Sequence, residues 1–348
     1  MPPSTLIIRA DASIAMGTGH VMRCLALAQA WQDQGGQCIF AMAETTAASE
    51  ERIRGERFEV LPVAATQGTL QDAAQVVELA QACHSSWVVM DGYQFDSEYQ
   101  RKVKAAGIKL LVVDDGGQYE SYSADFVVDQ NIDASEMTYE ERARSSQLLL
   151  GTRYVMLRRE FDRWREWTRD IPDTARRLLV TIGGSDPDGL TLRLVQALPK
   201  VCLPDMVATV VIGGSNPRVS QLRHAAEATG TPIELVCDPP NLPELMAQSD
   251  LAIICAGGTL WELLYMGCAI LSYTRGTLQA QVIAQLSALG AVLDLGAIES
   301  FDVTRLTAAI TMLAGRQRRE EMSRMGRKIV DGEGARRVLR GMLKGDPE

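Results

Sequence analysis

The sequence predicts an α/β protein with two doubly wound parallel sheets, that is, two Rossmann-like domains. Short apolar runs of strand length alternate with helical patterns almost from end to end, which is typical of β-α units around parallel sheets. Glycine outnumbers proline by 29 to 13, which suits many tight strand-to-helix turns. The length of 348 residues is too great for one small domain and fits two.

The first half of the chain predicts five strands separated by amphipathic helices. The strands are expected at Leu6–Arg9, Cys38–Met42, Trp87–Asp91, Leu110–Asp114 and Phe126–Asp129. The helices are expected at Val21–Gln34, Leu70–His84 and Ser97–Ala106. A pair of glycines at 35 and 36 provides a suitable end for the first helix.

The second half repeats this plan, which predicts a second sheet of the same kind. Its strands are expected at Leu178–Thr181, Val207–Ile212, Ile233–Val236, Leu251–Cys255, Ala269–Tyr273 and Val292–Leu295. Its helices are expected to begin near Gly189, Arg218, Leu242, Thr259 and Gln279. Between the halves, Phe161–Arg177 is charged and carries tryptophan, and we interpret it as a helix leading into a connector, with Pro172 near the boundary. We therefore place the two domains at residues 1–170 and 171–348.

Composition and charge exclude several classes of protein. Lys and Arg number 35 and Asp and Glu number 44, so the net charge of −9 lacks the cationic surface that nonspecific nucleic-acid binding needs. Nucleic acid is therefore not an expected partner. No apolar run approaches the roughly 20 residues of a membrane span. The start, Met1–Ala12, has no apolar stretch typical of a secretion signal, so we expect a cytoplasmic protein.

Cysteine and histidine usage favours neither a disulfide framework nor a metal site. The seven cysteines are an odd number without a Cys-x-x-Cys pair, and several lie in apolar runs, as reduced core thiols do. The three histidines lie far apart in the sequence, so we expect no metal. Met22 stands where the third glycine of a dinucleotide fingerprint belongs, so no nicotinamide and no other cofactor is expected.

The last part of the chain is basic. Arg305–Lys344 holds 11 basic and 4 acidic residues, a net charge of +7. It could bind an anionic ligand, but such a run is more often the solvated face of terminal helices, which is the interpretation we favour.

A histidine is the strongest catalytic candidate. The first strand runs through Arg9 and Asp11 into a glycine-bearing loop, and Gly19 and His20 open the next helix. His20 is thereby placed at the carboxyl edge of a sheet, where open α/β folds bind ligands. A helix N-terminus disfavours the imidazolium, so such a histidine tends to be neutral and able to accept a proton near pH 7. The alternative is a capping or surface histidine.

Glycine pairs in the second half predict an anion site. Gly183, Gly184 and Ser185 follow one predicted strand, and Gly257, Gly258 and Thr259 follow another. The backbone amides of such turns, with the dipole of the following helix, suit a diphosphate. Similar Ile-Gly-Gly-Ser sequences recur at 182–185 and 212–215, one β-α unit apart, which we interpret as local recurrence.

Two further sets of residues leave alternatives open. Glu262 lies three residues after Thr259, so it could accept hydrogen bonds from a ribose diol or complete a capping box. Asp114 and Asp115 end a strand and could line a sugar site, but strand-end aspartates often only bind turn amides, and we favour that role.

Several motifs resemble, in order and approximate spacing, the UDP-sugar hydrolases of pseudaminic acid biosynthesis. They are Gly-Thr-Gly-His-Val-Met-Arg-Cys at 17–24, Asp-Gly-Tyr at 91–93, Val-Asp-Gln-Asn at 128–131, the run at 150–160, Ile-Gly-Gly-Ser-Asp at 182–186 and Gly-Gly-Thr-Leu-Trp-Glu at 257–262. This resemblance covers most of residues 6–290. These hydrolases look like relatives of the MurG-type glycosyltransferases.

The resemblance implies a GT-B-like fold, with two domains facing across a cleft and UDP held mainly by the second. It implies hydrolysis of UDP-2,4-diacetamido-2,4,6-trideoxy-β-L-altropyranose at the anomeric carbon with inversion, using His20. A UDP-sugar is thus the expected partner, with Tyr93 and Asn131 positioning the sugar and Glu262 on the ribose. Arg9, Asp11, Gly19 and Gln279 are also expected to bind the substrate. UDP can depart without a general acid, so a base aimed at water is the remaining requirement.

The sequence departs from that family at two places. The family often has Asp-His-Tyr where this chain has Gly92 between Asp91 and Tyr93, and of a common Asn-Gln pair only Gln279 can be matched. Two other functions use the same nucleotide site: a GT-B glycosyltransferase with a UDP-amino sugar donor, and a non-catalytic nucleotide-sugar binding protein. The sequence leaves the oligomeric state open.

Overall fold

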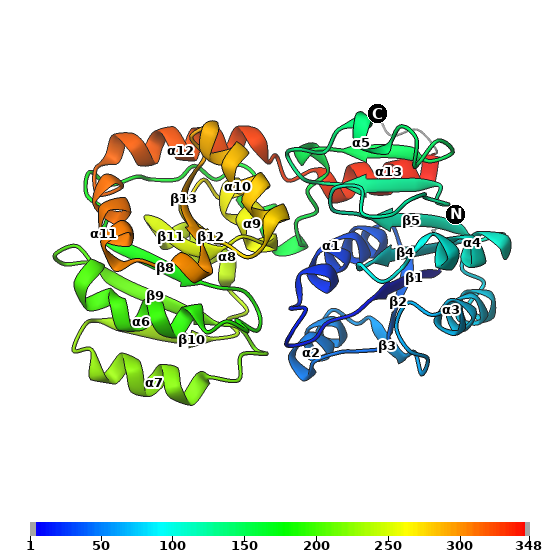
Figure 1. Ribbon diagram of the computed structural model, residues 1–348, viewed down its shortest axis with the longest axis horizontal. Helices are drawn as coiled ribbons and strands as arrows, with labels where there is room; N and C mark the ends of the chain where they lie inside the picture. Colours follow the sequence, from blue (N-terminus) through cyan, green and yellow to red (C-terminus); the bar gives the residue numbers. More distant parts are fainter. Residues whose placement is uncertain (1–4, 345–348) are drawn as a thin grey trace. The chain divides into compact units, whose positions relative to one another are not determined.

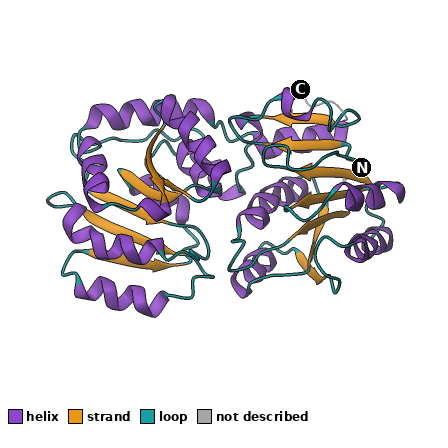
Figure 2. Cartoon of the chain, viewed as in Figure 1, coloured by secondary structure: helices purple, strands orange, loops and turns teal. Residues whose placement is uncertain are grey.

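The computed structural model describes residues 5–344, which form two compact units. The first contains the described residues up to Arg159 together with those from Gly332 onwards, and the second is Glu160–Asp331. Each unit holds one parallel β-sheet flanked by helices (Figures 1 and 2). The predicted fold class, two Rossmann-like parallel sheets, is confirmed. The first four and last four residues of the predicted domain ranges lie outside the described residues.

The first unit has a seven-stranded sheet in the order β3-β2-β1-β4-β5-β6-β7, and all of its neighbouring strands are parallel. The strands are β1 (Thr5–Ala10), β2 (Gln37–Met42), β3 (Glu59–Pro62), β4 (Trp87–Asp91), β5 (Lys109–Val113), β6 (Phe126–Asp129) and β7 (Gln147–Leu150). All five predicted strands of this half are present. β1 pairs directly with β4, so residues after these two strands meet at one edge.

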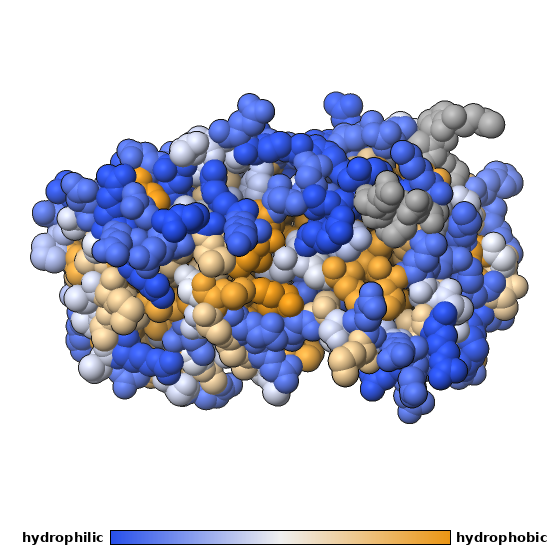
Figure 3. All heavy atoms as spheres, turned by 90° about the horizontal axis from the view of Figure 1, so that it is seen from above, coloured by the Kyte–Doolittle hydropathy of each residue, from blue (hydrophilic) through white to orange (hydrophobic). Residues whose placement is uncertain are grey.

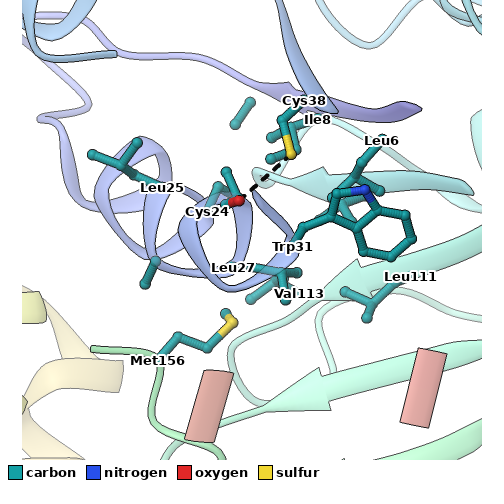
Figure 4. Close-up of a cluster of buried hydrophobic side chains, with 14 of the residues drawn as sticks. Leu6, Ile8, Cys24, Leu25, Leu27, Trp31, Cys38, Leu111, Val113 and Met156 are labelled. Carbon is teal, nitrogen blue, oxygen red and sulfur yellow. Dashed lines mark hydrogen bonds between the residues drawn. The ribbon is translucent and has the colours of Figure 1, made fainter. Parts of the chain in front are cut away.

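Helices cover both faces of this sheet. They are α1 (Gly19–Asp33), α2 (Ala47–Gly55), α3 (Leu70–Ala82), α4 (Ser97–Ala105), the short α5 (Glu136–Tyr139) and α13 (Gly334–Lys344). Leu6 and Ile8 of β1 belong to the core cluster under α1, whereas Ile7 belongs to the cluster under α3 and α4. This alternation follows from the period of two along a strand. Figure 4 shows the first cluster, in which Trp31 of α1 packs among strand side chains.

The last helix completes the core of the first unit. Val338, Leu339 and Met342 of α13 are buried in the same cluster as the apolar face of α1. Gly334 begins this helix so close to the backbone of Val155 that a Cβ there would overlap with it. The helix therefore packs with the amino-terminal unit, although the predicted second domain, 171–348, included it.

The second unit has a six-stranded parallel sheet in the order β10-β9-β8-β11-β12-β13. Its strands are β8 (Arg177–Thr181), β9 (Val207–Ile212), β10 (Ile233–Cys237), β11 (Leu251–Cys255), β12 (Ala269–Thr274) and β13 (Val292–Ala297). Its helices are α6 (Leu190–Val201), α7 (Val219–Ala228), α8 (Leu242–Gln248), α9 (Gly258–Tyr265), α10 (Thr277–Ala288), α11 (Val303–Met312) and α12 (Arg316–Ile329). The six predicted strands of this half are present.

The segment between the sheets differs from its prediction. A helix leading into a connector was expected within Phe161–Arg177, but the structure has only a 3-10 helix, η2 (Arg159–Trp164), followed by irregular chain as far as β8. Tertiary hydrogen bonds replace helical ones here. The Arg169 guanidinium donates to the carbonyl oxygens of Met246, Ala247, Ser249 and Met266. The predicted helix is therefore wrong.

The basic stretch at 305–344 forms helices α11, α12 and α13. On α12 the buried stripe is narrow, and Arg316 pairs with Glu320 at 2.6 Å on the exposed side. Arg319 is the exception, since it is buried and donates to the carbonyl oxygens of Leu313 and Pro172.

Most of the face drawn in Figure 3 is hydrophilic, with separate apolar patches. Within residues 5–344, no helix combines the length and the apolar character that crossing a membrane requires.

Candidate active site

A histidine and an aspartate meet at the carboxyl edge of the first sheet. His20, the second residue of α1, places its Nδ1 atom 2.6 Å from Oδ1 of Asp91, the last residue of β4. Asp91 is completely buried, and His20 is 8% exposed. A hydrogen bond closes the loop before α1: the Gly17 N–H donates to the Ser13 carbonyl oxygen at 2.8 Å. The β1–β4 pairing and this loop fix the two side chains against each other.

Arg23 joins this pair from one turn further along α1. Its Nε and Nη2 atoms donate to the two carboxylate oxygens of Asp91 at 2.6 and 2.7 Å. Its Nη1 and Nη2 atoms also donate to Asp115 at 2.8 and 3.0 Å. The guanidinium is thus held between two carboxylates, in the bidentate geometry that suits it.

The charges of this cluster support one tautomer of His20. Burial would raise the pKa of Asp91, but the Arg23 guanidinium and His20 outweigh burial and hold that pKa well below its ordinary value. Burial would also raise the pKa of Asp115, but the Arg23 guanidinium outweighs burial, so the pKa of Asp115 is lowered. Asp91 is therefore ionised and accepts a hydrogen bond from Nδ1–H, which leaves the lone pair on Nε2. Arg23 Nη2 lies 3.3 Å from Nδ1, the longer and weaker contact.

Tyr93 and Asn131, both predicted to bind the sugar, lie around the same cluster. Tyr93 is 55% exposed, and its ring contacts the His20 ring edge-on with 5.1 Å between centroids. Its hydroxyl donates to Asp115 at 3.3 Å, and Asn131 Nδ2 donates to the other oxygen of Asp115 at 3.0 Å. Burial and the Asp115 charge raise the pKa of Tyr93, so its hydroxyl stays protonated. The structure therefore brings together His20, Tyr93 and Asn131.

A buried carboxyl pair lies behind these residues. The Tyr139 hydroxyl is 2.7 Å from Oδ2 of Asp114 and 2.8 Å from Oδ2 of Asp129. One hydroxyl proton serves one of these contacts, so the other needs a protonated carboxyl group. Burial raises the pKa of Asp129 to about 6, so this carboxyl group holds a proton more readily than an ordinary aspartate does. Asp114 also accepts from the Gly117 N–H at 2.7 Å, which confirms its predicted turn-binding role.

Arg9 and Asp11, also predicted to bind substrate, are buried in the first unit. Arg9 donates to both oxygens of Asp72 at 3.0 and 2.8 Å and pairs with Asp11 at 2.7 Å. Asp11 accepts from the backbone N–H of Ala43 at 2.7 Å. The side chains of Arg9 and Asp11 have no exposed surface, so we give them a structural role. Gly19, by contrast, is exposed in the first turn of α1.

In the second unit, the first glycine pair follows β8. Gly183 is exposed in a left-handed conformation (φ 87°), and Ser185 is buried. The recurring Ile-Gly-Gly-Ser loop after β9 packs directly on this one. The Ser215 N–H donates to the Gly184 carbonyl oxygen at 3.1 Å, and a Cβ on Gly213 would overlap with the backbone of Gly184. The recurrence thus reflects close packing of two neighbouring loops.

The second glycine pair lies at the start of α9. Gly257 and Gly258 are exposed, and the helix begins at Gly258 with Gly257 as its N-cap. Thr259 is therefore inside the first turn and cannot act as the N-cap of a box with Glu262. Glu262 is half-buried in the next turn of the same helix. The capping-box alternative is wrong for this helix.

Gln279, the remaining predicted residue, lies in the first turn of α10 and ties two loops together. Its Oε1 atom accepts from the Arg275 N–H at 2.7 Å and lies 3.8 Å from Sγ of Cys255. Cys255 ends β11, immediately before the second glycine pair.

Sequence reasoning missed Arg23 and gave Asp91 no specific role in the first cluster. For Asp115 it favoured a turn-amide role, but the structure shows this side chain accepting from Arg23, Tyr93 and Asn131. One signal was available for Arg23, because residues three apart in a helix share a face and Arg23 follows His20 by three. Over residues 5–344, no group of three or more His, Cys, Asp or Glu side chains is arranged to hold a metal ion.

The predicted resemblance is confirmed by comparison with known proteins. The UDP-2,4-diacetamido-2,4,6-trideoxy-beta-L-altropyranose hydrolase of Campylobacter jejuni is 22% identical over 263 residues, 75% of this chain and 88% of that protein. The spore coat polysaccharide biosynthesis protein SpsG of Bacillus subtilis is 24% identical over 335 residues, 95% of each chain. An uncharacterized protein of Methanocaldococcus jannaschii is 22% identical over 282 residues, and the match spans 57% of its length. No protein-family model matches the sequence.

Solved structures agree on the fold. MurG of Acinetobacter baumannii superposes with a TM-score of 0.65 over 98% of this chain and 100% of that one, at 17% identity. A complex of S. aureus MnaA with UDP gives a TM-score of 0.68 over 98% of this chain and 96% of that one, at 12% identity. The chain thus has a GT-B-like fold of two Rossmann-like domains.

Proposed function

We propose that this chain is a UDP-sugar hydrolase that releases a diacetamido trideoxy sugar and UDP, in the biosynthesis of pseudaminic acid or a related polysaccharide sugar. The observation that carries the proposal is the contact between His20 and the ionised Asp91. The similarity to the Campylobacter hydrolase supports the substrate class. The similarity to SpsG supports a role in polysaccharide biosynthesis.

In the proposed reaction, His20 is the general base. Nε2 accepts a proton from water as the water oxygen bonds to the anomeric carbon, and the bond from that carbon to the phosphate oxygen breaks. The electron pair leaves with UDP, which disperses the negative charge, so a general acid is not needed at the leaving group. Asp91 stabilises the imidazolium that forms and holds its Nδ1–H. Solvent then removes the proton from Nε2.

The other residues divide between sugar and nucleotide. Tyr93 and Asn131, which share Asp115 as an acceptor, would position the acetamido groups. The glycine pairs of the second unit, of which Gly183, Gly257 and Gly258 are exposed, would bind the diphosphate through backbone N–H groups and the start of α9. Glu262 would accept the ribose hydroxyls. No metal or cofactor takes part in this scheme.

The test is turnover of a panel of UDP-amino sugars without acceptor in ¹⁸O-water. We expect release of UDP without ¹⁸O, because attack at carbon leaves both phosphate groups untouched. UDP is the informative product, since a free sugar exchanges its anomeric oxygen with water. NMR during the first minutes should show one anomer, inverted relative to the substrate.

Three results would contradict the proposal. Label in UDP would mean attack at phosphorus. Turnover only after addition of a saccharide acceptor would identify a glycosyltransferase. Binding of UDP-sugars without turnover under either condition would identify a binding protein.

A further inference from the structure

An arginine that the proposed function leaves without a role lies beside the glycine loops of the second unit. Arg275 follows β12, and its Nε atom is 2.5 Å from Oδ2 of Asp188, in the loop after β8. Its backbone N–H is held by Gln279 at 2.7 Å, and the same Gln279 oxygen contacts Cys255. Arg275 is thus fixed next to both strands that lead into glycine pairs.

Within the turns that follow the strands of this sheet, Arg275 is the basic side chain that a ligand can reach. The turns after the six strands of this sheet, 182–189, 213–218, 238–241, 256–257, 275–276 and 298–302, contain two basic residues, Arg218 and Arg275. Arg218 donates to the carbonyl oxygens of Asp186 and Pro187, so it stabilises the first glycine loop. Arg275 pairs instead with a carboxylate at the surface, and the two side chains are 38% and 41% exposed.

The negative charges at this edge of the second sheet favour a basic side chain in a diphosphate site. A diphosphate is an anion, and the loop that would receive it already carries Asp186 and Asp188. The start of a helix offers only about half a positive charge. A guanidinium supplies a full charge and matches phosphate oxygens in geometry, as it matches the carboxylate that it now binds.

We propose that Arg275 binds the diphosphate of the nucleotide and that Asp188 holds Arg275 in place until the nucleotide displaces it. This inference rests on the proposed function, because the diphosphate is that of the UDP-sugar. It adds a residue that stabilises negative charge on the leaving group. It also gives the two partners opposite roles: Arg275 favours nucleotide binding, and Asp188 competes with it.

The test is calorimetric titration of the full chain with UDP and with uridine. We expect Arg275→Gln to weaken UDP binding roughly 10- to 100-fold, as loss of a charged hydrogen bond does, and to leave uridine binding unchanged. Arg275→Lys should retain part of the affinity. Asp188→Asn should strengthen UDP binding severalfold. Arg316→Gln is the matched control, because it removes an exposed arginine paired at 2.6 Å with Glu320 on α12; UDP binding should not change.

Thermal unfolding of each variant shows whether it is folded. UDP binding by folded Arg275→Gln at wild-type strength would overturn the inference and leave the proposed function intact. Equal losses of UDP and uridine binding, or weaker UDP binding in Asp188→Asn, would show that the ion pair only supports the loops and would also overturn it. Failure of the wild type to bind UDP would overturn the proposed function itself.

Discussion

His20 Nδ1 and Asp91 Oδ1 lie 2.6 Å apart, although 71 positions separate the two residues in the sequence. The contact exists because β1 and β4 are neighbours in the sheet. Ionised Asp91 fixes which ring nitrogen of His20 carries the proton, and so which one can act as a base.

Asp91→Asn should therefore lower kcat by roughly 10²- to 10⁴-fold, because an amide can turn its NH2 group to Nδ1 and favour the wrong tautomer. UDP affinity, measured by calorimetry, should stay at the wild-type value, since Asp91 belongs to the first unit and the proposal assigns the nucleotide to loops of the second.

Asp115→Asn is the matched control for that variant. It also removes a carboxylate from Arg23, but it leaves the contact between His20 and Asp91 in place. Because Asp115 accepts from Tyr93 and Asn131, we expect a raised KM and a much smaller loss of kcat. Equal losses of kcat in the two variants would argue against a specific role for Asp91.

The buried Asp129 should make stability depend on pH. Burial raises its pKa from 3.8 to about 6, so the folded state binds this proton more tightly than the unfolded state does. The resulting stabilisation is complete below about pH 4 and is lost as the pH rises through 6, a change of roughly 3 kcal/mol. Urea unfolding should show that, between pH 4 and pH 8, the unfolding free energy of the wild type falls by this amount relative to that of Asp129→Asn. A constant difference between the two proteins would refute the expectation.

Gly213→Ala should separate the two packed glycine loops. Its Cβ would overlap with the backbone of Gly184, which cannot move without shifting the loop after β8. We expect a loss of roughly 1–3 kcal/mol in unfolding free energy and weaker UDP binding. Gly55→Ala, at the end of α2 with no atom within 4 Å of the new Cβ, should cost nothing. Denaturant unfolding and calorimetry on both variants check this; an unchanged Gly213→Ala protein would contradict it.

Asp72→Asn should destabilise the first unit by roughly 3–5 kcal/mol, because it leaves the buried Arg9 guanidinium without its bidentate partner. Tyr99→Phe removes only one hydrogen bond, of 2.8 Å, from the same carboxylate and should cost less. The two unfolding free energies can be compared by urea titration at one pH. The reverse order would mean that the charge of Asp72 is not what matters here.

The sequence predicted the central strands of both sheets and the two edge strands of the second sheet, but it missed the two edge strands of the first. Runs such as Trp87–Asp91 are buried on both faces and stand out as continuous apolar segments. The two missed strands, Glu59–Pro62 and Gln147–Leu150, are four residues long and form the two edges of the first sheet. Glu59 and Pro62 leave only two apolar residues in the first, and the second offers only the three leucines after Gln147. The missed helix Ala47–Gly55 has only two buried residues, so its apolar pattern is equally weak.

The same reasoning explains the outcome at the site. His20 could be placed because a strand, a glycine loop and a helix start adjoin it in the sequence. Asp91 and Asp115 could not be joined to it, since this requires the order of the strands, and a strand-end aspartate such as Asp114 commonly serves a turn amide. Arg9, near the end of the first strand, was expected to bind substrate, but only the packed structure shows that its side chain is buried in an ion pair with Asp72.

The return of α13 to the first unit has a consequence for synthesis of the chain. Val338, Leu339 and Met342 fill the cluster under α1, but a ribosome makes them only after the whole of Glu160–Asp331 has been translated. In the nascent chain, that apolar surface of the amino-terminal unit therefore stays uncovered until α13 has been made, whereas the second unit can complete its own core first.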